Sequence, residues 1–118
     1  MKNMRLMSIV GAGLVASLLW TGTSAHAETR WERHHPRRDQ VNDRLERQHA
    51  RIHAGLAKGQ LSSQEARQLS QEDRQIRLQE RALATQQGGH ITRAEQSQFN
   101  REENAVSRQI YRERHDGQ

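Results

Sequence analysis

The stretch that decides the fold is Gly59-Gln60-Leu61-Ser62-Ser63-Gln64-Glu65, which returns thirty residues later as Gly89-His90-Ile91-Thr92-Arg93-Ala94-Glu95. In each copy, a hydroxyl residue stands three positions before a glutamate. This is the signature of a capping box, in which the hydroxyl accepts from the third amide of a helix and the carboxylate accepts from the cap amide. An apolar residue before each cap can pack on the first turn, and the glycine suits the left-handed residue that ends a helix. We therefore predict two helix starts, each just after a helix end, from Leu61, Ser62, Glu65, Ile91, Thr92 and Glu95.

These caps divide the chain into three helices, which we expect at residues 39–58, 62–86 and 92–114. Apolar residues recur at seven-residue spacing in each of them, as Phe99 and Val106 illustrate, and this is typical of one packed helix face. The predicted fold class is all-α. It consists of an antiparallel hairpin of the two capped helices, with the N-terminal helix packed alongside as a third.

The apolar stripe on these helices is thin. Leu, Ile, Val and Phe account for thirteen of residues 28–118, which is below the roughly one fifth at which disorder becomes a concern. Several companion positions on the predicted core face are polar, and a dry coiled-coil seam would not accept them. We expect a wet margin beside the stripe, and we expect Asp43 with Arg47 and Asp73 with Arg77 to form favourable pairs one helical turn apart. The polar companions are Gln48, Asp73, Glu80 and Glu103.

The first residues have the pattern of a secretory signal. Lys2 and Arg5 precede an apolar run of about 14 residues, shorter than the roughly 20 that span a bilayer, and Ala25-His26-Ala27 offers a small-x-small cleavage site. We predict cleavage after Ala27 and a periplasmic or secreted protein, in contact with the membrane only through the transient signal peptide. The chain has no cysteine, so neither lipid attachment at the cleavage point nor a disulfide is expected.

After the predicted signal peptide at residues 1–27, we distinguish an arm and a domain. Residues 28–38 lack periodicity and hold the only proline, so we expect a flexible, disordered basic arm. Residues 39–116 form the predicted three-helix domain, and the internal repeat occupies residues 59–76 and 89–106.

The repeat resembles a motif of the small periplasmic stress chaperones of the Spy/CpxP type. Leu61-Ser62-Ser63-Gln64-Glu65 and Ile91-Thr92-Arg93-Ala94-Glu95 are similar to the two Leu-Thr-x-x-Gln motifs of that family, although both copies close on glutamate. The resemblance covers residues 61–106 and extends to the export signal and the basic charge. It implies a helical dimer whose curved basic face shields unfolded clients.

A weaker resemblance is to the helix-loop-helix of the EF-hand. Gly59 and Glu65 match the glycine and the closing glutamate of its calcium loop. The oxygen ligands at the first, third and fifth loop positions would fall on Ala54, Leu56 and Lys58, which offer no carboxylate. One alternative is therefore a small secreted protein with a metal-free EF-hand-like repeat, and we expect no cofactor.

Histidines supply a second alternative. His49 and His53 are one helical turn apart, where two imidazoles can share a zinc or copper ion, and His34 and His35 in the arm could complete the shell. This would make the protein a periplasmic metal-binding or metal-buffering protein. The competing interpretation is that these are exposed histidines on a polar helix.

Two arginine-rich clusters are candidate partner-binding sites, since arginine binds carboxylates, phosphates and aromatic faces. The competing interpretations are a solvated arm for the first cluster and the last turns of a packed helix for the second. Nucleic acid is not an expected partner outside the cytoplasm, although the formal net charge is +5. The candidates are Trp31, Arg37 and Arg38 in the arm, and Arg108, Tyr111 and Arg112 near the C-terminus.

The sequence does not predict an enzyme, because it has no thiol, no Gly-x-Ser-x-Gly elbow and no phosphate-binding loop. The leading expectation is a non-enzymatic exported helical interaction protein with a chaperone-like role. Its expected partners are unfolded or envelope protein clients and a second copy of the chain.

Overall fold

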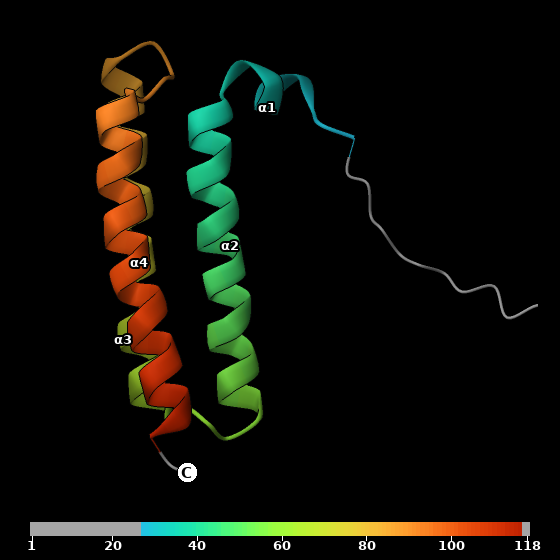
Figure 1. The fold of residues 1–118 in the computed structure, drawn as a ribbon, viewed down its shortest axis with the longest axis vertical. Helices are drawn as coiled ribbons and strands as arrows, with labels where there is room; N and C mark the ends of the chain where they lie inside the picture. Colours follow the sequence, from blue (N-terminus) through green and yellow to red (C-terminus); the bar gives the residue numbers. More distant parts are fainter. Residues whose placement is uncertain (1–26, 117–118) are drawn as a thin grey trace, which may run out of the picture.

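The computed structural model describes residues 27–116, so the predicted signal peptide lies outside the described residues except for Ala27. Within this range the chain forms four helices and no strand: α1 (Arg30–His34), α2 (Pro36–Ala57), α3 (Ser63–Gln86) and α4 (Arg93–His115). Helices α2, α3 and α4 form an antiparallel bundle, and α1 lies across the end where α2 begins (Figure 1). The all-α prediction is confirmed, including the hairpin of α3 and α4 with a third helix alongside.

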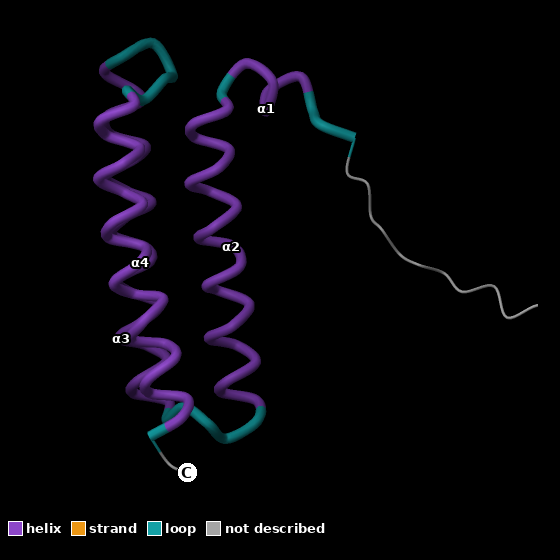
Figure 2. Tube along the Cα trace, viewed as in Figure 1, coloured by secondary structure: helices purple, strands orange, loops and turns teal. Residues whose placement is uncertain are grey.

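Short turns join the long helices, as the repeat predicts (Figure 2). The Ser62 hydroxyl accepts from the Glu65 amide at 3.1 Å, and the Glu65 carboxylate accepts from the Ser62 amide at 2.9 Å. Thr92 and Glu95 repeat this arrangement at 3.1 and 2.8 Å. The backbone hydrogen bonds hold the pKa of each glutamate below its ordinary value. Both predicted capping boxes are therefore confirmed.

The N-terminal arm differs from the prediction, because residues 30–34 and 36–38 are helical rather than disordered. Thr29 and Glu32 form a third capping box at the start of α1, with the Thr29 hydroxyl accepting from the Glu32 amide at 3.1 Å. Pro36 does not prevent α2 from starting there, since the first helical position needs no amide donor. Helix α2 thus begins three residues before the predicted start.

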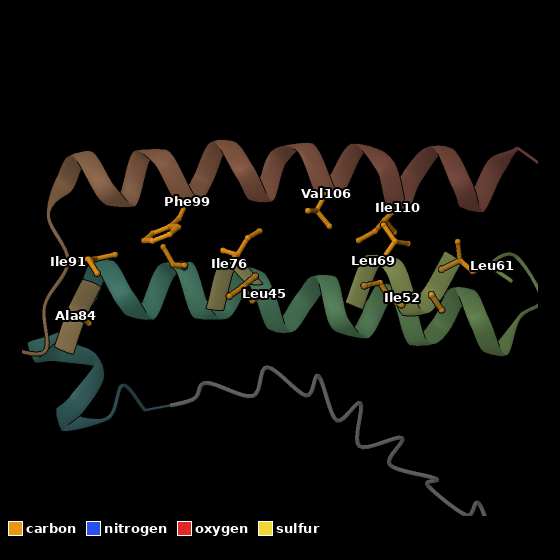
Figure 3. Packing of buried hydrophobic residues seen from close by; sticks show 12 residues of the cluster. Leu45, Ile52, Leu61, Leu69, Ile76, Ala84, Ile91, Phe99, Val106 and Ile110 are labelled. Carbon is orange, nitrogen blue, oxygen red and sulfur yellow. The ribbon is translucent and has the colours of Figure 1, made fainter. Parts of the chain in front are cut away.

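The core lies along the bundle axis, where Phe99, Val106 and Ile110 of α4 point toward Leu45 and Ile52 of α2 (Figure 3). Each of α2, α3 and α4 contributes one apolar stripe, and Leu61 and Ile91, which precede the two N-caps, also join this cluster. The complete buried set is Val41, Leu45, Ile52, Leu61, Ala66, Leu69, Ile76, Ala84, Ile91, Phe99, Val106 and Ile110.

The polar companions lie inside the bundle, so the predicted wet margin is wrong. Glu80 and Glu103 are fully buried, and Gln48 and Asp73 are 3% and 8% exposed. They are buried because the three long helices pack closely enough around their common axis to enclose these positions as well as the apolar stripe. Asp73 does not form the predicted pair with Arg77, and neither of its carboxylate oxygens has a hydrogen-bond partner.

Candidate functional site

Helices α2 and α4 meet along a line that we call the closed seam, because polar side chains bridge it. Gln40 donates to Asn100 at 3.1 Å, and Arg44 donates to the same amide oxygen at 3.0 Å. One to two turns further, Arg51 donates to the Ser107 hydroxyl at 2.7 Å. These bonds join residues more than fifty positions apart in sequence, and they follow the contact between the two helices from Gln40 to Arg51.

Helices α2 and α3 meet along a second line, which we call the open seam. Within residues 27–116, the ion pair between Arg38 and Glu80 is the only hydrogen bond or ion pair that joins side chains of these two helices. It lies at the end near α1, which is the upper end in Figure 1. Three hollows follow the rest of the open seam. Neighbouring hollows share Arg77 or Arg74, so they form one continuous face.

The lower hollow has a volume of about 660 Å³ and lies near the turn between α2 and α3. Ile52 and Ala66 are buried beneath it, and Leu56 beside them is 40% exposed. Small side chains on α3 leave the space open, namely Ser63, Ala66 and Ser70. The exposed basic groups around it are His53, Arg67 and Arg74.

The middle hollow has a volume of about 310 Å³ and is lined by Asp73 together with His49, Arg74 and Arg77. Burial raises the pKa of Asp73 to about 7, with Glu72 adding to the rise and Arg77 opposing it. A carboxyl group with this pKa is partly neutral near pH 7. Its proton removes much of the cost of burying a charge without a partner.

Asp73 belongs to a buried polar layer with Gln48 and Glu103. The Gln48 amide donates to the Glu103 backbone oxygen at 2.7 Å, and the Arg44 guanidinium lies 3.2 Å from the Glu103 carboxylate. Burial raises the pKa of Glu103 to about 7, while Arg44 opposes the rise and Asp73 adds to it. The layer thus contains two carboxyl groups, Asp73 and Glu103, at equivalent positions of the repeat. Only Glu103 has a cationic partner within residues 27–116, which is Arg44.

The upper hollow has a volume of about 500 Å³ and is strongly acidic. Five carboxylates line it, against the single guanidinium of Arg77. Burial, and then the neighbouring carboxylates, raise the pKa of Asp39 above its ordinary value. Trp31 lies at its edge and is 42% exposed. The five acids are Glu28, Glu32, Asp39, Asp43 and Glu46.

The first predicted partner-binding cluster lies at the upper end of the bundle, where most of it is engaged in internal contacts. Trp31 stacks on His35 with ring centres 4.6 Å apart, and His35 stacks on His90 at 4.7 Å. Arg38 lies 5.3 Å over the Trp31 ring and donates to the Gly89 backbone oxygen, while Arg37 donates to that of Ile91. These contacts hold the start of α2 against the turn between α3 and α4, and Trp31 of α1 joins them through His35 and Arg38.

The second predicted cluster lies far from the first, toward the lower end of α4. Arg108, Tyr111 and Arg112 line a hollow of about 370 Å³ together with Arg51 of α2. Tyr111 is 59% exposed and stacks on His115. The structure therefore separates the predicted basic residues into two surfaces, one mainly structural and one exposed.

The predicted histidine site is not assembled. His49 and His53 are in contact, with ring centres 4.3 Å apart. Because α2 is continuous, however, His35 lies about 21 Å away along the helix axis from His49. Residues 27–116 contain no group of three or more histidine or carboxylate side chains arranged to hold a metal ion. The turn between α2 and α3 is also too short to form an EF-hand calcium loop.

The chain matches no family model, no curated protein and no solved structure. Among the described residues, no helix has the length and apolar character needed to cross a membrane. The open seam was not identified from the sequence. The signal that indicates it is the series of small residues Ser63, Ala66 and Ser70 at helical spacing on α3.

Proposed function

We propose that the protein is a non-enzymatic, exported helical protein that binds segments of other polypeptides in a chaperone-like manner at the lower hollow of the open seam. The observation that carries this proposal is an apolar hollow of about 660 Å³ between two helices, with an exposed leucine and a basic surround. Exposed apolar surface rimmed by polar groups is typical of a protein interaction site.

The chemistry of the hollow indicates the kind of segment it binds. Ile52, Leu56 and Ala66 offer an apolar surface, while Arg67 and Arg74 beside them have no ion-pair partner within residues 27–116. Arginine next to apolar surface favours apolar side chains flanked by carboxylates. We therefore expect clients whose exposed apolar stretches carry neighbouring aspartate or glutamate.

The test measures light scattering of a thermally unfolding acidic protein mixed with the chain from Glu28 to Gln118. We expect the wild type to suppress aggregation, and Leu56→Asp to lose most of this effect because a charge enters the apolar surface. Leu78→Asp is the matched control, since Leu78 is an exposed leucine of α3 that lines none of the hollows. Equal suppression by both variants, with unchanged circular dichroism, would contradict the proposal.

A further inference from the structure

Basic side chains recur at seven-residue intervals on both sides of the closed seam. Seven residues are close to two helical turns, so each row lies on one face of its helix. The α2 row faces α4, because Arg37, Arg44 and Arg51 all donate hydrogen bonds to that helix or to the turn before it. The α4 row follows the same seam, since Arg108 lines a hollow together with Arg51. The rows are Arg37, Arg44, Arg51 and Lys58 on α2, and Arg101, Arg108 and His115 on α4.

The acidic residues of these two helices lie elsewhere. On α4, Gln87 at the end of α3 donates to Glu95 at 2.9 Å, which places Glu95 on the side of α3. Glu102 and Glu113 lie at helical spacing on that same side, and Glu103 is buried. The acids of α2 all line the upper hollow on the side of the open seam, and they are Asp39, Asp43 and Glu46.

We call the surface that carries both rows the basic face. Arg47 extends it on α2, and Tyr111 and Arg112 extend it on α4, where they line the hollow beside Arg51. Most of its basic side chains are exposed, and within residues 27–116 only Arg44 among them forms an ion pair. The α2 row is about 31 Å long, since it covers nearly the whole helix. A single small anion would contact only one end of such a row.

We infer that the basic face binds the surface of an anionic phospholipid bilayer, with α2 and α4 lying parallel to it. The two helices run side by side along the bundle, so their rows can meet an extended, flat array of phosphates together (Figure 1). Arginine binds phosphate through its planar fork, and each basic residue near an anionic bilayer strengthens binding about fivefold. Tyr111 is 59% exposed, and its ring suits the boundary between headgroups and acyl chains.

This inference rests on the proposed function only in the export of the chain, because an exported protein meets membrane surfaces whereas nucleic acid stays in the cytoplasm. It goes beyond the expectation from the sequence, in which only the signal peptide contacts the membrane. The basic face and the lower hollow lie on different sides of α2. A bilayer bound at the closed seam therefore leaves the open seam free for a polypeptide client.

The first test is co-sedimentation of residues 28–118 with phosphatidylcholine vesicles, with and without phosphatidylglycerol. We expect binding only when phosphatidylglycerol is present, and weaker binding as salt screens the exposed charges. Arg47→Glu with Arg108→Glu should weaken binding at least about tenfold, because it reverses one exposed charge on each helix of the basic face. The matched control is Arg30→Glu with Arg81→Glu, which makes the same change in net charge at exposed positions of α1 and α3 and should bind like the wild type.

The second test reports which side of the bundle contacts the bilayer. Trp31, the only tryptophan of residues 28–118, lies at the edge of the upper hollow, so phosphatidylglycerol vesicles should leave its fluorescence unchanged. Trp31→Phe with Tyr111→Trp moves the only tryptophan to the basic face. There its emission should shift to shorter wavelength as the ring leaves water.

A wild type that does not bind phosphatidylglycerol vesicles would overturn the inference. Equal losses in the two charge variants would do the same, because binding would then follow net charge rather than the basic face. Tighter binding to duplex DNA than to these vesicles at the same salt concentration would assign the rows to a nucleic acid instead. The outcome is separable from that of the proposed function. Suppression of aggregation without vesicle binding refutes only the bilayer, and vesicle binding without suppression refutes only the client.

Discussion

The closed and open seams share helix α2 and differ in what faces it. At the closed seam, α4 presents Asn100, Asn104 and Ser107, whose short polar side chains receive hydrogen bonds from long side chains of α2. At the open seam, α3 presents small residues between outward-pointing arginines, which leaves hollows. The two helices of the repeat therefore both contribute to one core, but α4 meets α2 through side-chain hydrogen bonds and α3 meets it mostly beside hollows.

The two buried carboxyl groups of the polar layer, Asp73 and Glu103, also differ in their partners. Glu103, next to the closed seam, forms an ion pair with Arg44, whereas Asp73, next to the open seam, forms none within residues 27–116; the carboxylate oxygens of both residues lack a hydrogen-bond partner. Both carboxyl groups are buried, and both have a pKa near 7. The difference between the seams therefore extends into the core.

The largest effect is expected from removing the aromatic anchor of α4. Phe99 is 1% exposed, so Phe99→Ala should lower the free energy of unfolding by about 3–5 kcal/mol through lost burial and a residual cavity. Leu56→Ala at the open seam should cost less than about 1 kcal/mol, since Leu56 is already 40% exposed. Urea unfolding of both variants measures the contrast, and equal losses would show that the open seam is as tightly packed as the core.

The next effect is a dependence of stability on pH. The folded pKa of Asp73 and of Glu103 is about 7, against ordinary values of 3.8 and 4.5. The unfolded chain therefore releases these protons first, and the free energy of unfolding should fall as pH rises from about 4 to 7. The exposed capping glutamates act in the opposite direction below pH 4.5, because their pKa is lowered.

Replacing Asp73 or Glu103 with the corresponding amide tests this pH dependence separately at the open and the closed seam. At pH 8, Asp73→Asn should raise the free energy of unfolding by about 1–3 kcal/mol, because it removes a buried charge that has no hydrogen-bond partner. Glu103→Gln should gain less, since it also abolishes the ion pair with Arg44. Thermal melts between pH 5 and 8 would contradict this account if the Asp73→Asn variant kept the pH dependence of the wild type.

The smallest effect compares polar groups at the two seams. Asn100→Ala removes the acceptor for Gln40 and Arg44 and should cost about 1 kcal/mol. Arg74→Ala, an exposed change at the open seam, should stay within about 0.5 kcal/mol. Chemical denaturation of each variant beside the wild type measures the two losses. A loss for Arg74→Ala as large as that for Asn100→Ala would mean that Arg74 also supports the fold.

The sequence by itself determined where the long helices begin and end. The capping hydrogen bonds join residues three positions apart, as in Ser62 with Glu65 and Thr92 with Glu95, and each glycine turn depends on one or two residues with positive φ. These interactions are local in sequence, so a short stretch of sequence is enough to predict them. The same pattern in Thr29 with Glu32 also marks α1, although residues 28–38 were predicted to be disordered. The all-α class follows from these signals and from the seven-residue apolar spacing.

Only the tertiary structure decided which polar residues are buried and which seam stays open. Arg38 with Glu80, Gln48 with Glu103 and Arg51 with Ser107 join positions 42 to 56 residues apart. A single polar residue among apolar ones gives the same sequence pattern in two cases. It can lie at the solvent-exposed edge of the core, or it can be covered by a third helix. Its burial depends on how three helices enclose a common axis, and that is a property of their packing rather than of any one segment.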